Sequence, residues 1–177
     1  MKSTTPNGFT LLNLLTAIVI ISLLVSTGMP AMSGFIANNQ ANSVYQRLFS
    51  LVQYTRLEAV SYRSQVILCP SHNRQHCIND WNQELMIFVD SNDDEVRNGD
   101  EKILRIDSPI GKHAELKWKP SGSKRYIRFN QSGETRNQNG RLTYCLHRGE
   151  QTFARQIIMY RSGRARKASI EEAEKQC

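Results

Sequence analysis

The chain has 177 residues and a formal net charge of +7, from 23 Lys and Arg against 16 Asp and Glu. This length allows one domain with an extended element and excludes a large multidomain protein. The charge is uneven, because residues 78–107 carry nine acidic and three basic side chains, whereas residues 110–167 carry fourteen basic and three acidic ones. One sign of charge over half of a small domain predicts an anionic partner: nucleic acid, a lipid headgroup surface or an acidic protein.

The first predicted element is a long apolar helix. Residues 9–29 are 21 residues without a charge, which as a helix span about 31 Å and match a hydrocarbon core of about 30 Å. The run is too long for a cleaved secretory signal, and Lys2 before it favours an N-terminus inside the cell and a head outside. We therefore predict a transmembrane helix over residues 9–29.

The helix is predicted to continue through residues 30–62. Apolar side chains recur there at steps of three and four residues, which is typical of a helix that packs one face on a core. Pro30 is expected to kink or locally loosen it. The apolar stripe comprises Ala41, Val44, Leu48, Leu51, Val52, Thr55 and Ala59.

Residues 63–177 are predicted to form a β-rich head. Short runs rich in Ile, Val, Tyr and Phe alternate with turn signals such as Asn98-Gly99 and Ser132-Gly133. A helix followed by strands indicates an α+β fold, with the long helix packed on antiparallel sheets. The last ten residues are expected to form a short acidic helix or to stay irregular. The predicted strands are 65–69, 84–90, 102–107, 115–119, 126–129, 141–146 and 155–160.

The head contains four cysteines, Cys69, Cys77, Cys145 and Cys177. An even number in a chain that is expected to be exported predicts two disulfides. Three connectivities are open, and the simplest joins Cys69 to Cys77 and Cys145 to Cys177.

Two segments have metal-binding patterns. Cys69, His72, His76 and Cys77 are zinc-type ligands, but their spacing fits no common zinc finger, and export favours a disulfide. Residues 90–101 place oxygen ligands at EF-hand-like positions, although Glu95 stands where that loop requires glycine. A polar hairpin explains this loop, so we predict no metal and no cofactor. The oxygen ligands are Asp90, Asn92, Asp94, Asn98 and Glu101.

The sequence contains no evident catalytic constellation. His113 and His147 are isolated, and neither a Gly-x-Ser-x-Gly nor a Walker motif is present. Trp81 and Trp118 lie beside predicted strands and are expected in the core rather than as base-stacking platforms. We therefore predict that the protein is not an enzyme.

The stretch GFTLLNLLTAIVIISLLVSTGMP, residues 8–30, resembles the class III signal of type IV pilins and type II secretion pseudopilins. The resemblance implies that residues 1–8 are a leader, that a prepilin peptidase cuts between Gly8 and Phe9, and that Phe9 is then methylated. It also implies an inner-membrane anchor with a periplasmic head, and later assembly with other pilins in an extracellular pilus. The fifth residue after the cut is usually Glu in this family and is Asn13 here, which supplies no charge.

Three later segments narrow the resemblance to the GspH/FimT minor-pilin family. They are ILCPS…C…DWNQELMIFVDSNDDEVRNGDEKILR, IRFNQSGETRNQNGRLTYC and RQIIMYRSGRARK, in this order. The branch that resembles FimT, a minor pilin implicated in DNA uptake, carries a GRxR signature, which residues 163–166 match.

The segment RSGRARK, residues 161–167, is the candidate DNA-binding site. Gly163 permits a tight bend. Arg164 and Arg166 point the same way, about 6.6 Å apart, in an extended segment, and guanidinium groups bind phosphate oxygens in a bidentate manner. The candidate residues are Arg161, Arg164, Arg166 and Lys167, with Lys124, Arg125 and Arg128 if the fold brings them near.

The sequence thus predicts a type IV minor pilin that binds double-stranded DNA, independently of base sequence, for uptake in natural transformation. One alternative is a structural minor pilin or pseudopilin, for pilus assembly or type II secretion without DNA binding. Another is an adhesin-like head that binds acidic surfaces or glycans. The site also has a simpler explanation, in which Arg164 and Arg166 pair with Glu171, Glu172 and Glu174 downstream.

Overall fold

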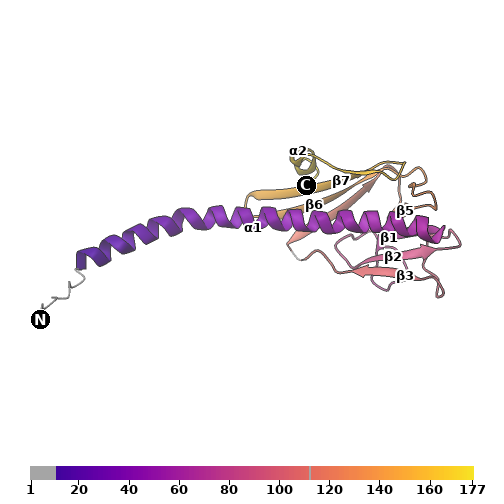
Figure 1. The fold of residues 1–177 in the computed structure, drawn as a ribbon, viewed down its shortest axis with the longest axis horizontal. Helices are drawn as coiled ribbons and strands as arrows, with labels where there is room; N and C mark the ends of the chain where they lie inside the picture. The colour runs from indigo at the N-terminus through magenta and orange to yellow at the C-terminus, as the bar shows by residue number, and fades with distance from the viewer. Residues whose placement is uncertain (1–10, 112) are drawn as a thin grey trace, which may run out of the picture. The chain divides into compact units, whose positions relative to one another are not determined.

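The structure is a computed structural model that describes residues 11–111 and 113–177. The predicted leader, residues 1–8, and the predicted cut between Gly8 and Phe9 lie outside the described residues and stay predictions. Figure 1 shows the fold, with labels on most of the helices and strands named below.

The chain forms two compact units, residues 1–38 and residues 39–177. One helix, α1 (Leu11–Tyr62), supplies the described part of the first unit and begins the second. It is continuous as secondary structure across Pro30, where the sequence predicts a kink.

The described part of the first unit is helical, and its large aliphatic side chains from Leu11 to Val25 are exposed. Thr16, Ser22 and Ser26 each donate their hydroxyl to the carbonyl three residues earlier, which satisfies polar groups in an otherwise apolar helix. Among the described residues, no helix is both long and apolar enough to cross a membrane. The span predicted over residues 9–29 includes two residues outside the described part of the chain, and it stays a prediction.

The second unit begins with the part of α1 that packs on the head. Its buried residues are three or four apart, as an amphipathic helix requires. Tyr45 is buried, whereas its neighbour Val44, a member of the predicted stripe, is only half-buried. Thr55 tolerates full burial because its hydroxyl donates to the carbonyl of Leu51 (2.7 Å). The buried face comprises Ala41, Tyr45, Leu48, Leu51, Val52, Thr55 and Ala59.

Sheet A has four antiparallel strands in the order β3-β2-β1-β5. Its central strands, β1 (Gln65–Pro70) and β2 (Leu85–Asp90), are buried at every residue. Strands covered on both faces read as continuous apolar runs rather than as an alternation, which explains their Ile-, Leu- and Val-rich sequences. The edge strands are β3 (Ile103–Asp107) and β5 (Ile127–Phe129).

Sheet B is also antiparallel, in the order β4-β6-β7-β8. The central hairpin of β6 (Gly140–Arg148) and β7 (Gln151–Met159) is paired along its whole length. At one edge lies β4 (Ala114–Pro120), beside β6. At the other edge lies β8 (Ala165–Lys167), which the sequence did not predict, beside β7.

The two faces of sheet B are covered by different elements. On one face, Arg155 of β7 donates to the side chain of Asn42 of α1 (2.8 Å). On the other, helix α2 (Ile170–Glu174) packs on β7, as Figure 1 shows. Successive side chains of a strand alternate between faces, so Ala154 lies on the opposite face from Arg155. Cys145 is directly opposite Ala154, shares its face and bonds to Cys177 at the end of the tail. We call this side, away from α1, the outer face of sheet B.

The α+β prediction, with a long helix and antiparallel sheets, is confirmed by this architecture. Most predicted strands end within two residues of those observed, but β7 begins four residues before its predicted start at residue 155. The tail forms a short acidic helix, α2, which starts with a capping box between Ser169 and Glu172.

Both disulfides join cysteines of the simplest pairing. Cys69, in β1, bonds to Cys77 with a Cα separation of 5.5 Å, and Cys145 bonds to Cys177 with a Cα separation of 5.8 Å. No cysteine of the described chain is left as a free thiol. The second bridge fixes the tail on the outer face of sheet B.

Replacing Cys145 and Cys177 together with serine is expected to cost more stability than replacing Cys69 and Cys77. The bridges are separated by 32 and 8 residues, and the loop-entropy relation then gives about 3.7 and about 2.5 kcal/mol. Urea denaturation of the two double variants measures the free energy of unfolding. A larger loss from the short loop would show that loop closure does not govern the difference.

Candidate nucleic-acid interface

The predicted RSGRARK segment forms an ordered turn and strand. Strand β8 pairs with β7, with Arg166 opposite Ile158. In the turn between them, the amide of Gly163 donates to the carbonyl of Tyr160 and the amide of Tyr160 donates to the carbonyl of Arg164, both at 2.9 Å. We call β7, this turn and β8 the arginine hairpin. The backbone that carries these arginines is thus fixed by hydrogen bonds.

Gly163 is required by a close backbone contact. A Cβ at this position would lie 1.8 Å from the carbonyl oxygen of Gly133, and the φ of Gly163 is +75°. The same carbonyl accepts a hydrogen bond from Nε of Arg56 in α1 (2.9 Å). The glycine of the GRxR signature therefore acts here by letting the turn dock on the loop after β5.

Thr135 provides a second attachment for the turn. It is fully buried, its amide donates to the carbonyl of Arg161 (3.0 Å), and its hydroxyl lies 3.2 Å from the same oxygen and 3.3 Å from the carbonyl of Tyr160. The backbone of the turn is consequently held at two points by the loop after β5, and Arg56 of α1 bonds to that loop.

Arg166 is held by three groups. Its Nε donates to the hydroxyl of Tyr160 (2.8 Å), and its Nη1 donates to the carbonyl of Lys167 (3.2 Å) and lies 3.5 Å from a carboxylate oxygen of Glu172. The hydrogen bond to Tyr160, followed by that to Glu172, raises the pKa of Arg166 above its usual value. The predicted pairing with a downstream acid thus occurs for Arg166, and it partly neutralises that charge.

Arg164 and Arg161 are more available. Both side chains are exposed, and neither forms an ion pair with another described residue. Arg164 precedes β8 by one residue, and residues two apart in extended chain face the same side. The side chain of Arg164 therefore lies on the same side of the hairpin as that of Arg166.

Lys167 lies on a different side from Arg166, because adjacent residues of β8 alternate. Its ammonium stands 5.0 Å from the ring centroid of Tyr45 in α1, a cation–π contact. The predicted group of four cations is thus divided, with Lys167 directed toward α1.

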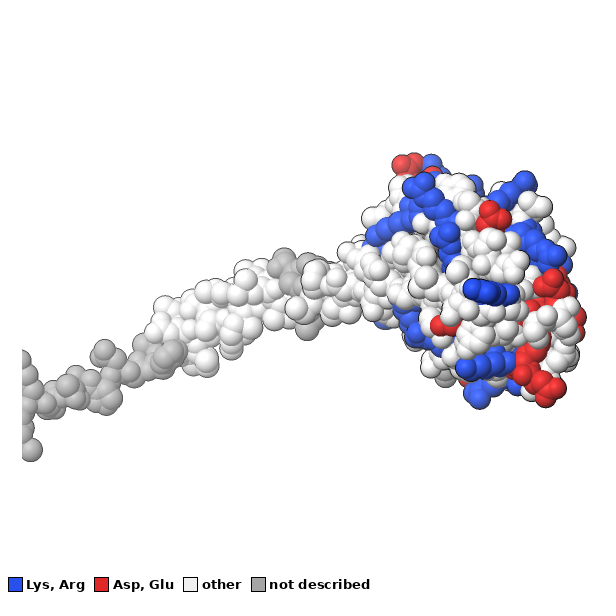
Figure 2. Space-filling model, turned by 45° about the vertical axis from the view of Figure 1, so that its right-hand side comes forward, with Lys and Arg blue, Asp and Glu red and all other residues white. Residues whose placement is uncertain are grey.

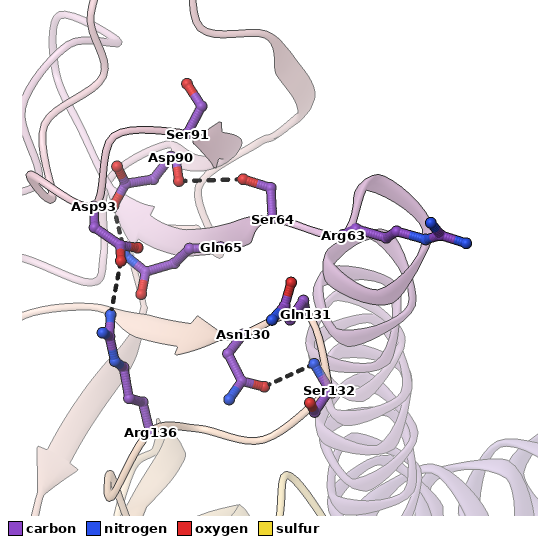
Figure 3. A pocket seen from close by; sticks show the side chains of 10 residues that line it. All are labelled: Arg63, Ser64, Gln65, Asp90, Ser91, Asp93, Asn130, Gln131, Ser132 and Arg136. Atoms are coloured by element: carbon purple, nitrogen blue, oxygen red, sulfur yellow. Dashed lines mark hydrogen bonds and ion pairs between the residues drawn. The ribbon is translucent and has the colours of Figure 1, made fainter.

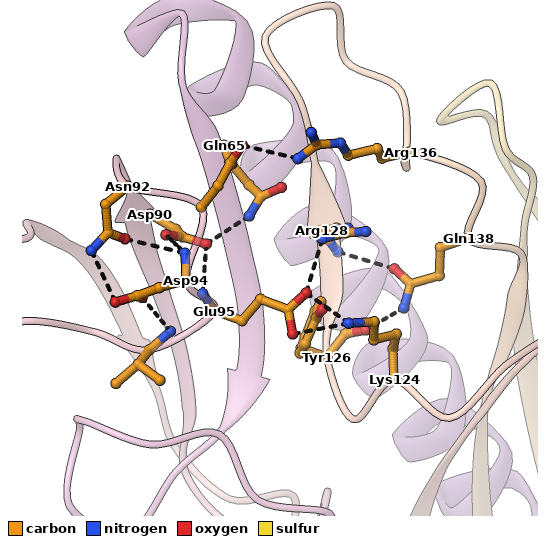
Figure 4. Close-up of polar contacts among 12 residues, drawn as sticks. Gln65, Asp90, Asn92, Asp94, Glu95, Lys124, Tyr126, Arg128, Arg136 and Gln138 are labelled. Atoms are coloured by element: carbon orange, nitrogen blue, oxygen red, sulfur yellow. Dashed lines mark hydrogen bonds and ion pairs between the residues drawn. The ribbon is translucent and has the colours of Figure 1, made fainter.

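The candidates outside the hairpin are mostly engaged elsewhere (Figure 4). Glu95 pairs with Lys124 (2.7 Å) and with Arg128 (3.1 Å). Burial alone would raise the pKa of Glu95, but the hydrogen bond from Lys124 and the nearby cations lower it below its usual value. Glu95 offsets one of these two positive charges, and both side chains are already engaged by it. Arg125, by contrast, is exposed without an ion pair among the described residues.

Several residues that position the arginine hairpin were not identified from the sequence. Tyr160 is 41% exposed, and its hydroxyl accepts a hydrogen bond from Arg166. Its position directly before the arginine cluster could have indicated this role from the sequence. Arg56 and Gly133 are 77 residues apart. Their meeting depends on how α1 crosses the head, which no local pattern reveals.

The two segments with metal-binding patterns contain other interactions. Cys69 and Cys77 of the zinc-type segment form a disulfide. In the acidic loop, carboxylates of Asp90, Asp94 and Glu101 lie within 4.8 Å of one another, and each accepts hydrogen bonds from its own loop. Burial, opposed by a hydrogen bond from a neighbouring glutamine, raises the pKa of Asp90 above its usual value. The loop is thus an internally bonded polar hairpin.

A polar hollow of about 340 Å³ lies between the end of α1 and the loops after β2 and β5 (Figure 3). Arg136 pairs with Asp93 (3.0 Å), and the amide of Ser132 donates to the side chain of Asn130 (3.0 Å). Arg63 points away from this group in Figure 3. The hollow therefore adds no open cluster of charge.

The tryptophans are core residues, because Trp81 and Trp118 are 2% and 7% exposed and their ring centroids are 5.9 Å apart. Elsewhere, Figure 2 shows acidic side chains gathered mainly along one side of the head, with Lys and Arg spread over the rest of that view. The uneven charge of the sequence is thus also uneven in space.

Comparison with known proteins identifies a matching family and similar structures. The model of the family described as type II transport protein GspH matches residues 45–163, more than half of the chain. The minor pilin FimU of Pseudomonas aeruginosa is 19% identical with a TM-score of 0.54, covering 78% of this chain and 96% of its own. The minor pseudopilin EpsH from the type 2 secretion system of Vibrio cholerae is 10% identical with a TM-score of 0.50, covering 73% and 97%.

No curated protein matches the chain by sequence. At these low identities, the two solved structures show similarity of fold alone, whereas the family match extends over most of the head. The chain therefore belongs to the GspH family of type II transport proteins, and its fold is the one found in minor pilins and minor pseudopilins.

Proposed function

We propose that this protein is a minor pilin whose head binds the phosphate backbone of double-stranded DNA through the arginine hairpin, for DNA uptake in natural transformation. The observation that carries the proposal is the exposed Arg164 beside Arg166 on a turn that the loop after β5 holds in place, a loop to which Arg56 of α1 bonds. A held turn loses little conformational entropy on binding, so more of the contact energy remains as affinity.

The chemistry of the site is suited to phosphate. Guanidinium groups donate two parallel hydrogen bonds to phosphate oxygens. Contacts to phosphate carry no base information, so binding is independent of sequence and weakens steeply with salt. Lys124 and Arg128 are left out of the proposed interface because both are already paired with Glu95.

The proposed minor pilin retains its long N-terminal helix. After the prepilin peptidase cuts between Gly8 and Phe9, the helix anchors the protein in the inner membrane and later packs with other pilins. The exposed aliphatic side chains from Leu11 to Val25 support this part of the proposal, because such a surface requires an apolar environment or a helical partner.

The two signature arginines are expected to supply much of the affinity for DNA. In the full chain solubilised in neutral detergent, Arg164→Gln/Arg166→Gln is expected to weaken duplex DNA binding by about tenfold or more, because two charge-assisted contacts are lost. Mobility shifts at several salt concentrations should also show a salt slope that is smaller by about two.

The matched control is Arg105→Gln/Arg148→Gln, which removes the same charge from β3 and from the far end of β6. It should bind nearly as well as the parent. If the parent does not bind, or if the two double variants bind alike, the protein is a structural minor pilin or pseudopilin without this function. Heparin competing as well as DNA would indicate a general polyanion binder.

Removing the acid beside Arg166 is expected to strengthen binding. Glu172→Gln abolishes a charge 3.5 Å from the guanidinium, and glutamine can retain the capping box. DNA affinity should rise by about twofold to fivefold. Glu171→Gln is the control, because Glu171 lies on the same helix but pairs with Lys175 (2.7 Å); equal effects of both variants would point to net charge alone.

Adding a methyl group at the signature glycine is expected to disrupt the hairpin. In Gly163→Ala, the Cβ meets the carbonyl oxygen of Gly133 at 1.8 Å and also imposes strain at φ +75°. Gly149→Ala is the matched control, because its φ of +59° brings similar strain with open space around the Cβ. Urea denaturation should show a loss of about 1–3 kcal/mol in the control and a clearly larger loss at Gly163.

A further inference from the structure

A second set of cations lies in register with Arg166. Across sheet B, Lys119 of β4 is opposite Arg141 of β6, Arg141 is opposite Ile158 of β7, and Ile158 is opposite Arg166 of β8. Directly opposite residues of an antiparallel sheet face the same side. These four side chains therefore form one line across the strands, which we call the transverse row.

The transverse row is on the outer face of sheet B and borders the C-terminal tail. The ammonium of Lys119 donates to the side chain of Gln176 (3.2 Å) at one end, and Arg166 lies 3.5 Å from Glu172 at the other. Since the Cys145–Cys177 bridge holds the tail on this face, the row lies beside it and faces solvent.

The central cation of the row is open. Arg141 is exposed, and its side chain forms no hydrogen bond or ion pair within residues 11–111 and 113–177. Lys119 is exposed as well. By contrast, Lys117, two residues before Lys119 on β4, is paired with Glu115 (2.9 Å), so it adds little open charge beside the row.

A hollow of about 400 Å³ lies along the row. Its lining includes Lys119, Arg141, Ile158 and Tyr160. The hydroxyl of Tyr160 accepts a hydrogen bond from Arg166, so Arg166 adjoins a residue of this lining. An extended anion that contacts Arg166 therefore has Lys119 and Arg141 within the same surface.

The length of the row suits a DNA strand. Three steps between neighbouring strands place Lys119 about 14 Å from Arg166 at the Cα atoms. Along the helix axis of a duplex, that distance corresponds to the rise of about four nucleotides of one strand. The row therefore offers cations along several consecutive phosphates.

We propose that Lys119 and Arg141 form a second half of the DNA interface, so that the phosphate backbone lies across the strands of sheet B from β8 to β4. This inference rests on the proposed function and deepens it, because it names the path of the duplex. It also extends the site beyond the GRxR signature to residues about 20 to 50 positions earlier in the sequence.

Two variants of the full chain in neutral detergent test the path with duplex DNA of unrelated sequences. Lys119→Gln/Arg141→Gln should lower affinity by about tenfold and reduce the salt slope by about two. Ile158→Arg adds a cation to the middle of the row, so it should raise affinity and increase the slope by about one. Thermal unfolding checks that each variant is folded.

Thr152→Arg is the control for the added charge, because Thr152 is on the same face of β7 but at the other end of the strand, opposite His147. It should change affinity less than Ile158→Arg does. The Arg105→Gln/Arg148→Gln variant is the control for the lost charges.

The outcomes separate this inference from the proposed function. If Arg164→Gln/Arg166→Gln weakens binding while Lys119→Gln/Arg141→Gln binds like the parent, the transverse row is wrong and the proposed function stands. The transverse row is also wrong if Ile158→Arg and Thr152→Arg change affinity equally. If the parent itself does not bind duplex DNA, both proposals fail.

Discussion

The arrangement of the arginine hairpin depends on one close backbone contact. Gly163 lies against the carbonyl of Gly133 at a distance that no side chain would permit, and Arg56 of α1 binds the same carbonyl. The helix, the loop after β5 and the turn after β7 meet at this point, so α1 is joined there to segments of both sheets. Because a backbone contact involves no rotamers, it restricts the direction of the arginines more firmly than a side-chain contact does.

Lysine and arginine side chains of this head differ in how far their charge is already engaged, and the neighbouring residues determine the difference. Arg128 pairs with Glu95, Lys167 lies over the ring of Tyr45, and Arg166 pairs with Glu172. Arg164 and Arg141, by contrast, are exposed. A surface cation that is already paired gains less from a phosphate, because the existing pair must be broken. The net charge of +7 therefore does not show which positive side chains are free to bind an anion.

Much of the fold followed from local patterns. The amphipathic stripe predicted the face of α1 that packs on the head, and apolar runs predicted seven strands. The exception is β8, which has only three residues and no apolar alternation, so that nothing in its own sequence indicates a strand. It is a strand because β7 supplies its hydrogen-bond partners. The early start of β7 was missed for the same reason, since its polar first residues are paired with β6.

By itself, the sequence determined the fold class, the candidate arginine cluster at residues 161–167 and the glycine within it, because hydrophobic periodicity and residue chemistry are local properties. Only the tertiary structure decided which cations are open and which face the same way. Those outcomes depend on strand register and on contacts between distant segments, such as Arg56 with Gly133 or Glu95 with Lys124. A one-residue change of register would turn Arg141 to the opposite face of the sheet, and no linear pattern encodes that choice.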